Sequence, residues 1–88
     1  MKFKTLRLAV LATAALGALP VIAQTEIQFW HSMTAVNNEW VNDLANQYNA
    51  SQKDYKVVPT FKGSYAESMT AAIAAFRAGN APHVLQVF

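Results

Sequence analysis

Cysteine is absent from the 88 residues of this chain. The chain therefore forms no disulfide bond, which is the usual means by which small secreted domains compensate for a thin core. The absence also excludes a cysteine nucleophile. A folded unit of about 60 residues buries only roughly 60% of the surface that its unfolded chain exposes. Such a chain is either unusually well packed or part of a larger structure.

Clustered positive charge is also lacking in the larger part of the chain. Residues 24–88 contain four basic and five acidic side chains, whereas residues 1–23 contain three basic side chains and no acidic one. The net charge of residues 24–88 is therefore −1. A nucleic-acid partner requires clustered cations on the folded part of a protein, so none is expected.

Catalytic patterns are missing as well. The sequence has no G-x-S-x-G between a strand and a helix, and no glycine-rich loop that could hold a phosphate. A general acid–base pair needs two carboxylates that face one pocket, but Glu39, Asp43 and Asp54 fall on polar helix or loop positions. We therefore expect neither enzyme activity nor a cofactor, and an enzyme is left open only if its machinery lies in other sequence.

The apolar run near the start is too short to cross a bilayer. It extends from Leu8 to Leu19, about twelve residues, whereas a membrane span needs roughly 20. Basic residues precede the run, Pro20 ends it, and the residues up to Ala23 are small or of modest size. Residues 1–23 are therefore predicted to be a secretory signal peptide that is removed after Ala23, with a membrane anchor as the alternative.

Hydrophobic periodicity predicts three strands and two helices in the remaining residues. The strands are predicted at residues 26–30, 55–61 and 83–88. The first helix is predicted from Val36 to Tyr48, and the polar residues 49–54 should end it. The second helix should begin at Ser64, which forms a capping box with Glu67, and should stop at Gly79 and Asn80.

The predicted order of strand, helix, strand, helix, strand indicates an α/β fold. Crossovers between parallel strands are right-handed in about 98% of cases, and such a unit is half of a doubly wound sheet. Pro59 cannot donate to a ladder, which favours an edge position for the second strand and the spatial order 2-1-3. Residues 24–88 are expected to form one partial domain, since the third strand is apolar and the chain stops there.

Three short segments should meet at one edge of this sheet. In open α/β sheets, ligands bind outside the carboxyl ends of the strands. "FWHSM" (29–33) follows the first strand, "KGSY" (62–65) follows the second, and residues 86–88 end the third. The candidate ligand-binding residues on this rim are Trp30, His31, Ser32, Lys62 and Tyr65.

Each candidate also has a plain structural explanation. Tyr65 could pack as a first-turn helix residue, Trp30 could pack at the rim, and Lys62 could be a solvated turn residue instead of a phosphate ligand. Ser32 precedes a helix start, where free N–H groups favour anions. His31 could bind a metal only with further ligands, and His83 lies at the far start of its strand, so no metal site is expected.

The segments "FWHSM", "DYKVVPTFKGSY" and "AAIAAFRAGNAPHVLQVF" together resemble the extracellular solute-binding proteins of ABC importers, family 1. The resemblance covers nearly all of residues 26–88 and is weakest between Thr34 and Gln47. It implies a periplasmic protein of two lobes, of which residues 24–88 would be part of lobe one. It also implies that the chain is an amino-terminal fragment of a protein that acts as a monomer.

The resemblance further implies a ligand, a partner and a role for one residue. The ligand would be sn-glycerol-3-phosphate, with glycerophosphodiesters as further candidates, and the partner would be a membrane permease. Tyr65 matches a family tyrosine that contacts the glycerol part of the ligand. The alternatives are a sugar-binding relative of the same family, the start of a secreted hydrolase, or a small secreted interaction module.

Overall fold

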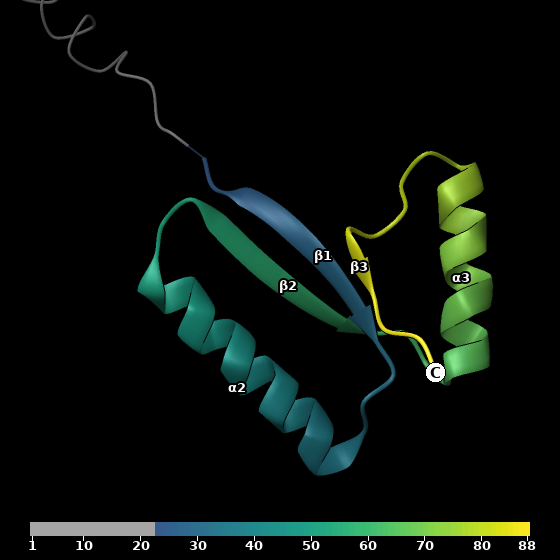
Figure 1. Cartoon of the computed structure of the whole chain (residues 1–88), viewed down its shortest axis with the longest axis horizontal. Coiled ribbons are helices and arrows are strands. Elements are labelled where there is room, and N and C mark those ends of the chain that lie inside the picture. Colours follow the sequence, from purple (N-terminus) through teal and green to yellow (C-terminus); the bar gives the residue numbers. More distant parts are fainter. Residues whose placement is uncertain (1–22) are drawn as a thin grey trace, which may run out of the picture.

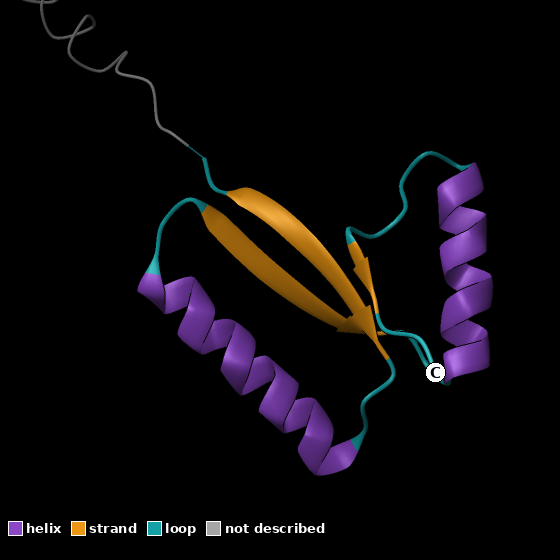
Figure 2. Cartoon of the chain, in the orientation of Figure 1, coloured by secondary structure: helices purple, strands orange, loops and turns teal. Residues whose placement is uncertain are grey.

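The structure is a computed structural model that describes residues 23–88. The predicted signal peptide, residues 1–23, lies outside the described residues except for Ala23. Five elements follow one another along the described part, alternating between strand and helix (Figures 1 and 2). They are β1 (Thr25–His31), α2 (Ala35–Ser51), β2 (Tyr55–Phe61), α3 (Tyr65–Arg77) and β3 (Val84–Leu85).

The three strands form a parallel sheet in the order β2-β1-β3. Residues 25–31 of β1 pair in register with residues 55–61 of β2, and Phe29 and Trp30 pair with the two residues of β3. The helices α2 and α3 lie on opposite sides of the sheet (Figure 1). The predicted α/β class and strand order are therefore confirmed.

Two elements differ from their predicted bounds by more than one residue at an end. Helix α2 continues to Ser51, through polar residues that were expected to end it. It continues because the Asn49 side chain is hydrogen bonded to the backbone of β2 and is part of the packing. Strand β3 contains only Val84 and Leu85, not residues 83–88, although the Gln86 N–H still donates to the Trp30 carbonyl at 2.9 Å.

The outer edge of β2 is occupied by side chains from the end of α2 and the following turn. The Asn49 amide accepts the Val57 N–H at 2.8 Å and donates to the Val57 carbonyl at 2.9 Å. Gln52 bonds both backbone groups of Tyr55 in the same way, at 2.8 and 2.6 Å. Since alternate residues of a strand point their backbone groups to the same side, Pro59 also faces outward, where its missing N–H leaves nothing unpaired.

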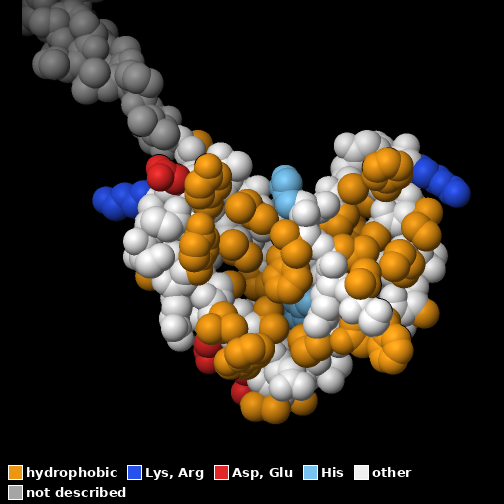
Figure 3. Space-filling view, in the orientation of Figure 1, with side chains coloured by type: hydrophobic (Ala, Val, Ile, Leu, Met, Phe, Trp, Pro, Cys, Tyr) orange, Lys and Arg blue, Asp and Glu red, His pale blue; other side chains and the backbone are white. Residues whose placement is uncertain are grey.

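Few apolar side chains are buried in the described residues. Only Ala45 and Ala72 are, whereas Trp40 is 62% exposed and Phe76 is 75% exposed. Apolar side chains cover much of the surface in the space-filling view (Figure 3). A groove of about 390 Å³ lies between α2 and the sheet, and one of about 270 Å³ lies between α3 and β3. The described helices include none with the length and hydropathy of a membrane span.

Candidate functional site

The carboxyl ends of the three parallel strands meet at one rim of the sheet. The segments that follow them are tied together by hydrogen bonds. The Lys62 N–H donates to the His31 carbonyl at 3.0 Å, and the Ser32 N–H donates to the Gln86 side-chain carbonyl oxygen at 2.9 Å. The structure therefore brings the predicted rim segments together, and a ligand placed there would meet side chains from all three.

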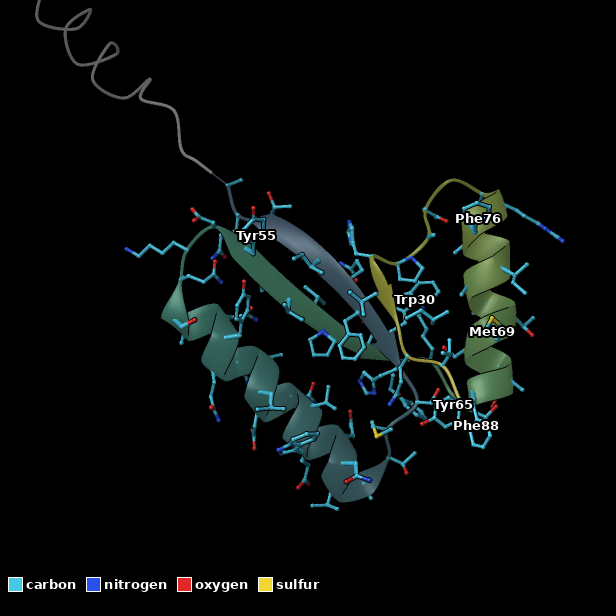
Figure 4. All side chains as sticks on the ribbon, viewed as in Figure 1. Trp30, Tyr55, Tyr65, Met69, Phe76 and Phe88 are labelled. Carbon is cyan, nitrogen blue, oxygen red and sulfur yellow. The ribbon has the colours of Figure 1, made fainter. Side chains whose placement is uncertain are left out.

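Trp30 and Lys62 form a pair at this rim. The Lys62 Nζ lies 4.0 Å from the centroid of the Trp30 ring, within the range of a cation–π interaction. Both side chains are half-buried. The Trp30 ring lies between β3 and α3 (Figure 4). Lys62 is therefore not the freely solvated turn lysine that was one of the two expectations.

Tyr65 lies where β2 gives way to α3. It is the first residue of the helix, it is half-buried, and its ring meets that of Phe88 edge to face at 5.5 Å between centroids (Figure 4). The backbone around it is fixed by the predicted capping box, which is present: the Glu67 N–H donates to Ser64 Oγ and the Ser64 N–H donates to Glu67 Oε1, both at 3.1 Å. Gly63 supplies the positive φ of 90° that the turn requires.

The capping box also affects the charge of its acidic member. The Ser64 backbone N–H is the main cause of a pKa of Glu67 below its ordinary value, and the Ser64 side chain adds to it. Partial desolvation acts in the opposite direction. Glu67 is therefore held as an anion at the start of α3, where the helix dipole favours negative charge.

His31 is a buried support of the rim. Its side chain has no solvent exposure and packs between the rings of Phe29 and Phe61, with centroids 5.7 and 6.2 Å away. Nδ1 accepts the Met33 N–H at 3.2 Å, so the neutral ring carries its proton on Nε2, which has no partner among the described residues. Burial lowers the pKa of His31, because the charged form would lose its hydration.

Ser32 and the start of α2 show incomplete hydrogen bonding. Ser32 Oγ is buried without a partner in the described part of the chain. Thr34 is the N-cap residue of α2, but its side chain makes no capping bond, and the first turn contains no acidic residue. Ala35 then enters the helix at a φ of 50°, a left-handed conformation that costs a non-glycine residue roughly 1–2 kcal/mol.

Metal binding finds no support within residues 23–88. No group of three or more potential ligand side chains gathers there, and His83 Nδ1 is taken up as the acceptor of the Gln28 N–H at 2.9 Å. Two rim residues, Gln86 and Phe88, were not among the predicted candidates. Gln86 could have been found, because it is the one polar residue in the otherwise apolar stretch 84–88.

Taken together, the sheet order and the rim define an α/β domain of the doubly wound type, a class in which ligands bind outside the carboxyl ends of the strands. No family model matches the sequence. The sequence is similar to the sn-glycerol-3-phosphate-binding periplasmic protein UgpB of several bacteria. It is 59% identical to that of Agrobacterium fabrum over 66 residues, which is 75% of this chain and 15% of the relative.

Two other relatives show the same pattern. The Rhizobium meliloti protein of that name is 51% identical over 77 residues, 86% of this chain and 18% of the relative. The Yersinia enterocolitica protein is 54% identical over 67 residues, 76% of this chain and 15% of the relative. The chain thus spans less than a fifth of the length of these relatives, and the resemblance expected from its sequence is confirmed.

Proposed function

We propose that this chain provides part of lobe one of a periplasmic solute-binding protein that serves an ABC importer. Residues 1–23 direct its export, and residues 24–88 form the start of the lobe. The complete protein captures sn-glycerol-3-phosphate, and glycerophosphodiesters are the second class of ligand to test. It delivers the solute as a monomer to a membrane permease and catalyses no reaction. The observation that carries this proposal is the 59% identity to a protein named for this ligand.

The rim residues have distinct roles in this proposal. Tyr65 contacts the hydroxyl end of the solute, because its phenol can both donate and accept a hydrogen bond and its ring can cover ligand carbons. Trp30, Ser32 and Lys62 line the same edge. His31 has no exposed surface, so it supports the turn through Met33 without touching the solute.

A chimera supplies the rest of the fold for a binding test. In it, residues 24–88 of this chain replace the matching segment of the Agrobacterium fabrum relative. Calorimetric titration with sn-glycerol-3-phosphate should show one binding site. Binding of a neutral sugar in its place would favour the sugar-binding alternative, and no binding of either solute by a folded chimera would contradict the proposed function.

Substitution of Tyr65 tests the site itself. A net hydrogen bond is worth about 0.5–1.5 kcal/mol, so Tyr65→Phe should weaken binding by roughly two- to tenfold. Tyr65→Ala should weaken it further, because ring contacts are also lost. The control is Tyr55→Phe, since Tyr55 is exposed at the opposite end of β2 and should leave affinity unchanged. A Tyr65→Ala chimera with a lower melting temperature but full affinity would make Tyr65 a structural residue only.

A further inference from the structure

The turn between β2 and α3 is held from two sides. On one side, the Lys62 backbone N–H is bonded to the His31 carbonyl, and the Lys62 ammonium group sits 4.0 Å from the Trp30 ring centroid. On the other side, Ser64 and Glu67 close the capping box. Gly63 lies between these two attachments and has the wide conformational freedom of glycine. The direction in which α3 leaves the turn therefore depends on both attachments.

The contact between Lys62 and Trp30 can be released by a change in one side chain that leaves the capping box intact. The backbone bond to His31 continues the pairing of β1 with β2 and is available to any residue except proline. The contact with Trp30 needs a cation, and Trp is the strongest aromatic partner for one. Trp30 is itself fixed on β1 by pairing with Leu85 of β3. The ammonium group thus ties the turn to the central strand of the sheet.

We propose that Lys62 is a positioning residue for Tyr65: its contact with Trp30 anchors the turn that presents the tyrosine to the solute. This inference rests on the proposed function for the identity of the solute. Lys62 acts through Trp30 and the backbone of residues 63–65, and it does not ligate the solute. The charge of Lys62 interacts with the Trp30 ring and not with the solute, so this anchoring of the turn would work equally well for an anionic or a neutral ligand.

The first test needs no ligand. Hydrogen exchange is followed in the chimera at the Lys62 and Glu67 amides, whose acceptors are known. Lys62→Met keeps the length of the side chain and removes its charge, and it should speed exchange of both amides by about three- to fivefold, as loss of a partly buried cation–π contact implies. Lys62→Arg should restore protection. Lys56→Met, at an exposed lysine of β2, is the matched control and should have no effect.

The second test is a double-mutant cycle on affinity for sn-glycerol-3-phosphate. If Lys62 positions Tyr65, Lys62→Met should weaken binding in the parent chimera and have little further effect once Tyr65→Ala is present, because that background lacks both the phenol and the ring. Equal effects of Lys62→Met in both backgrounds would mean direct contact with the solute and would overturn the positioning role. Unchanged exchange in Lys62→Met would overturn it as well, whether or not the parent binds the solute. A folded chimera that binds nothing but shows the exchange effect would contradict only the proposed function, and a chimera that cannot fold would contradict the shared fold on which both rest.

Discussion

His31 should make the stability of this part of the fold sensitive to mild acid. Its imidazole is fully buried, and burial lowers the pKa. The unfolded chain therefore takes up a proton on this histidine at a higher pH than the folded chain does. The stability that the neutral ring contributes is present above the ordinary pKa of about 6.5, and it is lost as the pH falls from there toward the lowered folded value.

The size of the effect can be worked out from one proton, one hydrogen bond and one buried donor without a partner. Between the folded and unfolded pKa values, the free energy of unfolding should change by up to about 1.4 kcal/mol per pH unit. His31→Phe abolishes this slope and keeps a ring between Phe29 and Phe61. The substitution removes an unpartnered buried donor, a penalty of about 1–3 kcal/mol, and also the acceptor of the Met33 N–H, worth about 0.5–1.5 kcal/mol. Near neutral pH the variant should therefore match the parent or exceed it by about 1 kcal/mol.

Urea unfolding of the chimera at several pH values between neutral and about 5.5 measures this difference. The difference in the free energy of unfolding between His31→Phe and the parent should increase steadily in favour of the variant as the pH falls. The control is Tyr55→Phe, at an exposed residue of β2, which leaves His31 and its neighbours intact and should retain the parent's slope. Identical pH slopes in the parent and in His31→Phe would refute the reasoning.

Three further substitutions test local features of the fold. Ser64→Ala should lower the free energy of unfolding by about 1 kcal/mol. An NMR titration of this variant should show the pKa of Glu67 rising only part of the way to its ordinary value, because the Ser64 backbone N–H, the main cause of the lowered pKa, remains. Ala35→Gly should raise the melting temperature, since the relief of the left-handed strain, roughly 1–2 kcal/mol, exceeds the entropy that glycine adds to the unfolded chain, about 0.4–1 kcal/mol; a lower melting temperature would contradict the strain. Asn49→Ala should cost about 1–3 kcal/mol in urea unfolding, because two bonds to Val57 are lost, whereas an unchanged midpoint would mean that water replaces them.

Local signals in the sequence were sufficient to predict most elements. The bounds of β2 and the start of α3 follow from an alternating run and a capping box, both of which act over a few residues. Pro59 gave the strand order because its missing N–H restricts it to an edge. The predicted end of α2 was wrong. Asn49 is a poor helix former on its own, but its side chain is hydrogen bonded to the backbone of Val57, eight residues further along the chain.

The contacts that join the rim could not be predicted in the same way. Lys62 meets Trp30 and Gln86 meets Ser32 only after the sheet has assembled, and no periodicity in the sequence records these pairs. The sequence did place these segments at one edge, because parallel strands share their carboxyl end. Which side chains touch there depends on rotamers and on the twist of the sheet. His31 was for the same reason counted among the candidate ligand-binding residues, although its side chain packs against two phenyl rings and has no solvent exposure.

The side-chain amides along β2 affect whether copies of this chain can associate through the edge of the sheet. An open strand edge is a template on which another copy can stack and extend into a cross-β fibril. On β2 the outward groups of Tyr55 and Val57 are already bonded by Gln52 and Asn49, and Pro59 offers no donor. This side of the sheet is therefore protected against fibril growth as soon as α2 and β2 have formed. Among the described residues, the edge of the sheet that lacks such side-chain amides is the opposite one, along β3.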